Sequence, residues 1–99
     1  MNPIIWTPVA KRSLQQTVDF ISEVWNEKIV DVFLTELDSR IVQFQANPEL
    51  AKRLENTEFR QLSVHRTVSL FYQNYSDHTK ILLVWDNRQN SSKLIQNLT

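Results

Sequence analysis

The sequence predicts a two-layer α+β domain in which a helical hairpin covers one face of a mostly antiparallel sheet, in the order β-α-α-β-β-β. Two observations lead to this fold class. Apolar residues recur at helical spacing through the first half of the chain and alternate at strand spacing through the second half. The 99 residues, of which 41% are hydrophobic and 22% charged, suit one globular domain that spans residues 1–99.

A strand and a helix are predicted at the start of the chain. Residues 3–6 form a short apolar run, which indicates the strand. Thr7 and Pro8 are residue types preferred at the N-cap and the first position of a helix. A single apolar stripe follows at spacings of four, three and four, which predicts a helix that ends near Asn26; the stripe consists of Leu14, Val18, Ile21 and Trp25.

A second helix is predicted directly after the first. Pro48 disfavours helical geometry at Asn47, so this helix should end near Ala46 or Asn47. Because the connection between the two helices is very short, they should form an antiparallel hairpin. The second apolar stripe alternates spacings of four and three and consists of Val30, Leu34, Leu37, Ile41 and Phe44.

The second half of the chain predicts three strands. They cover residues 59–64, 67–75 and 81–85, with turns at His65–Arg66 and at 76–79. Segment 81–85 is apolar on both faces, so we expect it to be the central and most buried strand. Residues 48–58 should hold one helical turn at their start, and residues 93–99 a last turn or strand. Packing of the hairpin on the sheet should bring together Leu34, Leu37, Ile41, Leu82 and Val84.

Two residue types are absent, and each absence excludes a kind of site. Without glycine the chain cannot form the phosphate loops of Walker or Rossmann proteins, and its tight turns should use Asn, Asp, Ser or His. Without cysteine it can form neither disulfides nor a thiolate metal site. Two separated histidines indicate no metal, and we expect no cofactor. No signal peptide or membrane span is evident, so we expect a cytoplasmic protein.

The formal net charge is zero, but the two halves of the chain differ. Residues 1–58 hold six Lys or Arg against nine Asp or Glu, a balance of −3. Residues 59–99 hold five against two, a balance of +3, and both histidines. The second half is therefore the better candidate for contact with an anion such as phosphate, although a split of this size also arises by chance.

Several strings in this order have counterparts in one family of small bacterial proteins. They are residues 5–10 (IWTPVA), 47–50 (NPEL), 59–62 (FRQL), 70–73 (LFYQ) and 81–89 (ILLVWDNRQ). With the predicted order of elements they resemble the RelE/ParE toxin superfamily over nearly the whole chain.

The resemblance implies the toxin of a type II toxin–antitoxin (plasmid stabilisation) system, which arrests bacterial growth until its cognate antitoxin neutralises it. An antitoxin segment would lay a helix into a hydrophobic groove and add a strand to a sheet edge. The antitoxin usually carries the DNA-binding part, and this chain shows no helix-turn-helix signature. We therefore expect contact with operator DNA only through the antitoxin, and no contact with membranes.

Two activities occur in the superfamily. RelE-like members are metal-independent endoribonucleases that cut mRNA on the ribosome, whereas ParE-like members inhibit DNA gyrase. RNA cleavage by the 2′-hydroxyl needs a base, an acid and cations around the phosphorane. By resemblance, Arg88 matches the nuclease arginine that follows the last core strand. The middle-strand arginine falls on Ser69, the paired lysines fall near Phe59 and Gln61, and the tail tyrosine falls near Leu94, so three of these four features are missing.

Other residues are available as substitutes. Arg60, His65 and Arg66 lie close together in sequence, and a histidine can act as acid or base near neutral pH. With Arg88 they are the candidate catalytic residues, or target-binding residues if the chain is no enzyme, and we expect the three arginines to share one surface. The alternative is that His65–Arg66 is a solvated turn pair and that Arg88 pairs with Asp86.

Charge and aromatic residues bear on the choice of activity. A net charge of zero is unfavourable for RNA binding, which neutralises phosphates. Four aromatic residues could stack on bases, but their strand spacing is more typical of a core: Phe71, Tyr72, Tyr75 and Trp85. His78, in the next turn, is more typical of a solvated residue. The sequence therefore favours ParE-like, non-nucleolytic action. A RelE-like nuclease and a degenerate toxin that only binds its antitoxin remain open.

Overall fold

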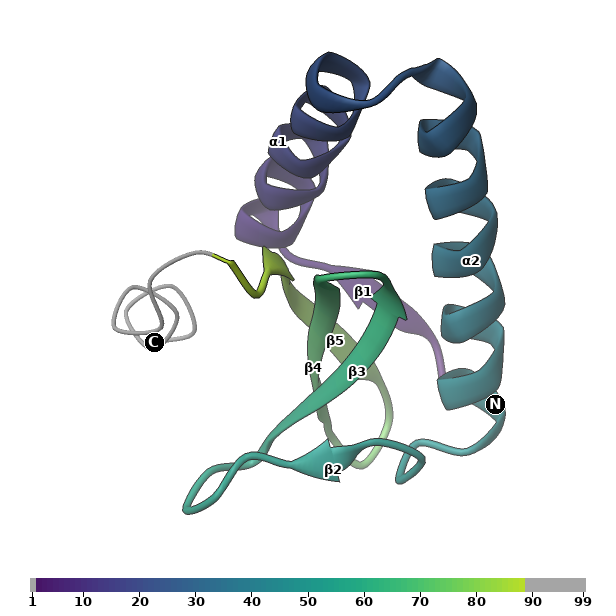
Figure 1. Cartoon of the computed structure of the whole chain (residues 1–99). Helices are drawn as coiled ribbons and strands as arrows, with labels where there is room; N and C mark the ends of the chain where they lie inside the picture. Colours follow the sequence, from purple (N-terminus) through teal and green to yellow (C-terminus); the bar gives the residue numbers. More distant parts are fainter. Residues whose placement is uncertain (1, 89–99) are drawn as a thin grey trace.

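The computed structural model describes residues 2–88 and confirms the two-layer α+β architecture. Its elements are β1 (Ile4–Trp6), α1 (Pro8–Val24), α2 (Glu27–Ala46), β2 (Lys52–Arg53), β3 (Phe59–His65), β4 (Val68–Asn74) and β5 (Thr79–Asp86). The strands form one sheet in the order β1-β5-β4-β3-β2. β1 pairs parallel with β5, and the other three pairings are antiparallel. The two helices form a hairpin over one face of this sheet, with α1 packed on β5 and α2 on β3 (Figure 1).

Both helices begin at side chains that cap their first turn. Thr7 Oγ1 accepts a hydrogen bond from the backbone N of Ala10 at 3.1 Å, and Asn26 Oδ1 accepts one from the backbone N of Ile29 at 3.0 Å. Trp25 and Asn26 alone separate α1 from α2. α2 ends at Ala46, before Pro48, as the sequence predicts. Neither helix within residues 2–88 has the length and apolarity needed to cross a membrane.

A bulge in β5 decides which side chains face the helices. Phe71 lies opposite Leu83 but Tyr72 lies opposite Ile81, so Leu82 is an extra residue in this strand. Ile81 and Val84 consequently join the core beneath the helices. The core on the opposite face of the sheet, the outer face, consists of Phe71, Leu83 and Trp85 with Val9, Leu54, Phe59 and Leu82 packed against it.

The predicted packing of α2 is therefore correct except at one residue. Leu37 is 3% exposed and shares the helix-side core with Val84, and Leu34 and Ile41 pack against that core. Leu82, however, packs on the outer face. The prediction was wrong there because the bulge reverses the alternation that a regular strand would have.

The sequence prediction placed segment 81–85 at the centre of the sheet, which is wrong, and it missed one strand of the sheet. β4, in which residues 69–72 are fully buried, lies at the centre of the sheet, and β5 lies beside it. The reason is β2, whose two residues pair with Arg60 and Gln61 and add a fifth strand beyond β3. β2 was not predicted because both of its residues are exposed and polar, so it has no apolar alternation. The segment 93–99, for which a turn or strand was expected, lies outside the described residues.

The turns partly follow the residue types that were expected. Asn56 has a φ of 61°, in the left-handed region that asparagine tolerates well. Arg66 has a φ of 48°, although arginine is not among the residues expected in a tight turn. The β3–β4 turn thus uses an arginine where many proteins use glycine.

The linker that follows α2 is anchored by the central strand. The Tyr72 hydroxyl donates to the carbonyl of Pro48 at 3.1 Å and accepts from the backbone N of Ala51 at 3.3 Å. The Asn74 side chain donates to the same Pro48 carbonyl at 2.7 Å. The Tyr72 ring stacks on Phe44 with 4.3 Å between centroids. Burial raises the pKa of the Tyr72 hydroxyl, which therefore remains a neutral donor.

Helix side chains occupy the sheet edges that no strand covers. β1 pairs only with Thr79–Ile81, and beyond it the backbone N of Val84 donates to Ser13 Oγ on α1 at 2.9 Å. On β3, the carbonyl of Ser63 accepts from Arg40 Nε on α2 at 3.1 Å. Covered edges of this kind are poor templates for pairing with other chains.

We expect Tyr72→Phe to lower the free energy of unfolding by about 1–3 kcal/mol, because it leaves a buried backbone donor without its partner. The phenyl ring would keep its stacking on Phe44. The matched control is Tyr75→Phe, at a tyrosine that is 39% exposed; it should change stability by less than about 0.5 kcal/mol. Urea denaturation measures both, and equal effects would contradict the anchoring role of Tyr72.

Candidate functional site

Two of the candidate arginines converge on one indole ring at the end of α1. The Arg66 Cζ lies 4.7 Å from the centroid of the Trp25 ring. The Arg88 Cζ lies 5.8 Å from the same ring and 4.9 Å from the ring of Phe20. Trp25 caps α1, Arg66 lies in the β3–β4 turn and Arg88 follows β5, so three segments distant in sequence meet here. We call Phe20, Trp25, Arg66 and Arg88 the arginine–aromatic cluster.

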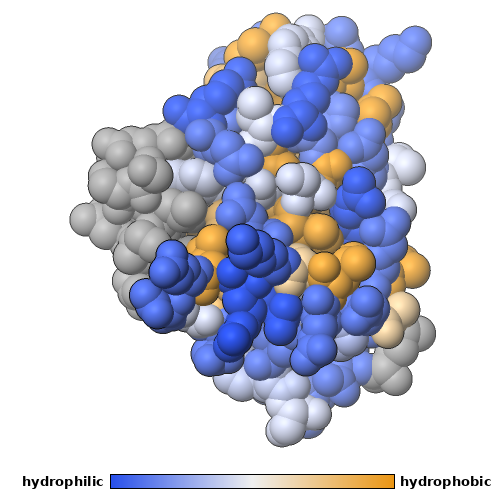
Figure 2. All heavy atoms as spheres, turned by 60° about the horizontal axis from the view of Figure 1, so that its bottom comes forward, coloured by the Kyte–Doolittle hydropathy of each residue, from blue (hydrophilic) through white to orange (hydrophobic). Residues whose placement is uncertain are grey.

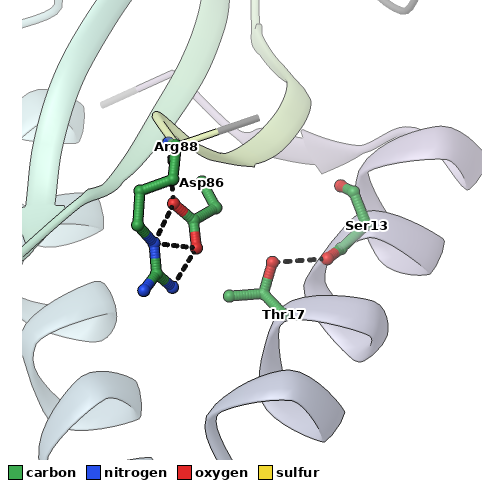
Figure 3. A network of polar contacts seen from close by, with 4 residues as sticks. All are labelled: Ser13, Thr17, Asp86 and Arg88. Carbon is green, nitrogen blue, oxygen red and sulfur yellow. Dashed lines mark hydrogen bonds and ion pairs between the residues drawn. The ribbon is translucent and has the colours of Figure 1, made fainter. Parts of the chain in front are cut away.

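Arg88 is neutralised by Asp86, as one reading of the sequence expected. Its Nε donates to Oδ1 of Asp86 at 3.0 Å and its Nη2 donates to Oδ2 at 2.5 Å (Figure 3). The backbone N of Arg88 adds a third bond, to Oδ1 at 2.9 Å. Hydrogen bonding to Arg88 lowers the pKa of the Asp86 carboxyl although burial opposes this, and the same pairing raises the pKa of Arg88.

His65 is engaged at both ring nitrogens. Its Nδ1 lies 3.0 Å from Oε2 of Glu36 on α2, and its Nε2 accepts from Nε of Arg66 at 3.2 Å. This pattern assigns the proton of a neutral imidazole to Nδ1. The His65 side chain is only 10% exposed. Neither ring nitrogen is open to a substrate in this arrangement.

Arg60 does not join the other arginines. Its Nη1 donates to the carbonyl of Ala51 at 2.6 Å, in the linker after α2. Arg60 and Arg66 lie six residues apart on and just beyond an extended strand, about 20 Å along its length. The expected surface shared by three arginines therefore contains Arg66 and Arg88, with His65 beneath them, but not Arg60.

Gln61 and Ser69, which by the resemblance fall near positions expected to carry cations in a RelE-like nuclease, belong to an uncharged network here. Ser69 is fully buried, and its Oγ accepts from Gln61 Nε2 at 3.3 Å and from Asn87 Nδ2 at 2.9 Å. Amide and hydroxyl groups neither neutralise a phosphate nor exchange protons readily near neutral pH. The tail position near Leu94 lies outside the described residues.

The other polar and aromatic candidates lie elsewhere. His78 pairs with Asp77, with 2.6 Å between Nδ1 and Oδ1, and stacks on Tyr75 in the β4–β5 turn, at the opposite end of β4 from Arg66. The pairing with His78 lowers the pKa of Asp77. Phe71, Tyr72 and Trp85 are at most 5% exposed and belong to the cores, as their spacing suggested. Among residues 2–88 no three His, Asp or Glu side chains gather where they could hold a metal ion.

A groove next to the cluster separates α1 from the end of β5. It has a volume of about 460 Å³. Val9, Phe20 and Leu83 are among its apolar lining residues, and Arg12, Thr17 and Asp86 among its polar ones. Figure 3 shows the Asp86–Arg88 pair on one side and Thr17, on α1, opposite it. Arg88 lines the groove as well, so the groove and the cluster form one continuous surface.

Sequence reasoning missed Trp25 as a site residue and placed it only in the core stripe of the first helix. It does pack against the core. Its contact with Arg66 and Arg88 arises because the β3–β4 turn and the segment after β5 both reach the end of α1. The position of Trp25 directly before the short helix connection was the only local signal.

Residues 4–91 match the family model described as the ParE toxin of the type II toxin-antitoxin system, parDE. The chain therefore belongs to the ParE toxin family, within the superfamily that the sequence resembles. No curated protein matches the sequence.

Two solved structures share this fold. One is described as a chromosomal ParDE TA system from P. aeruginosa; it is 18% identical, with a TM-score of 0.72 over 85% of this chain and 94% of that chain. The other, described as the YoeB dimer from Staphylococcus aureus, is 15% identical, with a TM-score of 0.55 over 81% of this chain and 90% of that chain.

The pairing of Asp86 predicts how stability depends on pH. The native carboxyl of Asp86 keeps its charge to lower pH than the unfolded one, whose pKa is about 3.9. Below about pH 4 the unfolded state thus binds more protons, and the stabilisation is lost as pH falls through the lowered native pKa. The margin of the wild type over Asp86→Asn should be largest at neutral pH and shrink below about pH 4.

Urea denaturation at a series of pH values checks this. The control is Asp38→Asn, at an exposed residue of α2 that forms no ion pair within the described part of the chain. It should leave the unfolding free energy at neutral pH almost unchanged. If the difference in unfolding free energy between the wild type and Asp86→Asn grew as the pH fell, the prediction would be contradicted.

Proposed function

We propose that this chain arrests bacterial growth by binding DNA gyrase, without cutting RNA, and that a cognate antitoxin neutralises it. The observation that carries the proposal is that, among residues 2–88, the groups expected for RNA cleavage are either missing or bound by other side chains. Arg88 is bound by Asp86, His65 by Glu36 and Arg66, and the outer face of the sheet holds the neutral Gln61–Ser69 contact. A toxin whose candidate acid–base residues are occupied by other side chains is expected to act by binding its target.

The antitoxin is proposed to bind in the groove between α1 and β5. The solved relative from P. aeruginosa is described as a toxin–antitoxin system, which supports an antitoxin partner here. The apolar residues Val9, Phe20 and Leu83 suit the apolar side of an amphipathic antitoxin segment. Arg12 also lines the groove, where it can pair with an acidic residue of that segment. Operator DNA would be contacted through the antitoxin, and both partners would place the chain in the cytoplasm.

Purified protein tests the proposal in two assays. In a bacterial cell-free translation system, primer extension should show intact mRNA. In a supercoiling assay with purified DNA gyrase, the same protein should inhibit the enzyme. The Arg88→Ala variant is compared with the wild type in both assays. It removes the arginine that matches the nuclease arginine of RelE-like toxins and leaves Gln61, Ser69 and His65 in place.

The outcomes separate the candidate activities. Ribosome-dependent cuts within codons that disappear in Arg88→Ala would replace the proposal with a RelE-like nuclease. Soluble protein that neither inhibits gyrase nor cuts mRNA, and whose expression leaves growth normal, would indicate a toxin that only binds its antitoxin. Gyrase inhibition with intact mRNA is the expected result.

A further inference from the structure

The arginine–aromatic cluster is open to solvent although its members hold one another in place. Phe20 is 39% exposed and Val24, one turn further along α1, is 50% exposed. Arg66 and Arg88 are exposed as well. Tryptophan and arginine are the residues that most often dominate the energy of protein interfaces, particularly where apolar neighbours keep water out. The composition of this surface is therefore that of a protein-binding site.

Arg66 carries the charge that this surface offers to a partner. Its Nε is bound to His65, but within residues 2–88 no carboxylate pairs with its guanidinium. Arg88, in contrast, already has a bidentate partner in Asp86. Because the Arg66 guanidinium lies over the face of Trp25, it is held in one place before any partner arrives. A partner carboxylate can pair with it at little cost in side-chain entropy.

Protein fits this surface better than nucleic acid does. Phe20 and Val24 would meet no apolar group on a phosphate backbone. A protein segment can supply a carboxylate and an apolar side chain together.

We propose that the arginine–aromatic cluster, with Val24, docks the target protein through a segment that presents a carboxylate beside a large apolar side chain. The carboxylate pairs with Arg66, and the apolar side chain packs on Phe20 and Val24. This inference rests on the proposed function, because it requires that the toxin acts by binding. Phe20 and Arg88 also line the groove assigned to the antitoxin, so an antitoxin seated there covers part of the target surface.

Substitutions that place a negative charge at Val24 and at Arg66, neither of which lines the groove, test the docking surface. The variants are Val24→Asp and Arg66→Glu. Val42→Asp is the matched control for the first, since Val42 is 66% exposed on α2. Arg53→Glu is the control for the second, since its side chain is 55% exposed on β2. β2 lies at the end of the molecule that comes forward in Figure 2, a face on which hydrophilic residues prevail.

Each variant is first shown to be folded by its thermal unfolding transition. Three quantities are then measured: the concentration that half-inhibits gyrase supercoiling, growth after induction, and the Kd for the purified cognate antitoxin. We expect Val24→Asp and Arg66→Glu to weaken gyrase inhibition about tenfold or more and the controls to change it less than about twofold. The Kd for the antitoxin should change less than about threefold in all four variants.

The outcomes keep the two proposals apart. If the wild type inhibits gyrase and the cluster variants inhibit it as the controls do, the docking surface is wrong and the proposed function stands. If the wild type arrests growth without inhibiting gyrase, gyrase is the wrong target, and loss of arrest in the cluster variants alone would still support the docking surface. Cluster variants that lose antitoxin binding, or a self-association that only they abolish, would assign the surface to the antitoxin or to a second copy and overturn the inference.

Discussion

The attachment of α1 to β5 is the constraint on which the rest of the structure depends. Thr7 Oγ1 donates to the carbonyl of Ile81 at 2.9 Å, and three residues further along β5 the backbone N of Val84 donates to Ser13 Oγ at 2.9 Å. These bonds lie on either side of the bulge at Leu82, so they hold the strand where its alternation reverses. With α1 fixed in this way, the groove beside it has two rigid walls, and the end of α1 lies where the β3–β4 turn and Arg88 meet. Substituting Ser13 would thus affect an edge, a bulge and the candidate site together.

Features with a local cause were predictable from the sequence. Helix starts at Thr7 and Asn26 and the end before Pro48 depend on caps and on proline geometry within a few residues. The strands 59–65 and 68–74 follow from alternation, and the strand 79–86 from an apolar run. The bulge at Leu82, the central position of β4 and the existence of β2 depend on pairing between segments, which a periodic pattern does not record. Leu82 shows this directly, since a regular alternation from Ile81 to Trp85 would have given Ile81 and Val84 opposite faces.

The candidate site was predictable only where its members are neighbours in sequence. His65 and Arg66 do meet, and Arg88 pairs with Asp86 as a two-residue separation allows. Arg60 was grouped with them because it is near in sequence, but extended backbone separates residues faster than any other conformation, and six positions place it at the other end of β3. Trp25 has the reverse relation, being 41 residues from Arg66 and 4.7 Å from its guanidinium. Proximity in sequence therefore assigns too many strand residues to a site, and it misses a residue such as Trp25 that reaches the site from the end of a helix.

The energetics of the paired charges favour binding over catalysis on this scaffold. For Arg88 to stabilise a phosphorane it would have to leave Asp86, and the buried carboxylate would then lose a charge-assisted bidentate partner. For His65 to accept a proton at Nε2 it would have to release Arg66. Each rearrangement adds to the barrier of a reaction that the neutral Gln61–Ser69–Asn87 network does nothing to lower. Binding requires neither rearrangement, because Trp25 already holds the Arg66 guanidinium at the surface where a partner carboxylate can reach it.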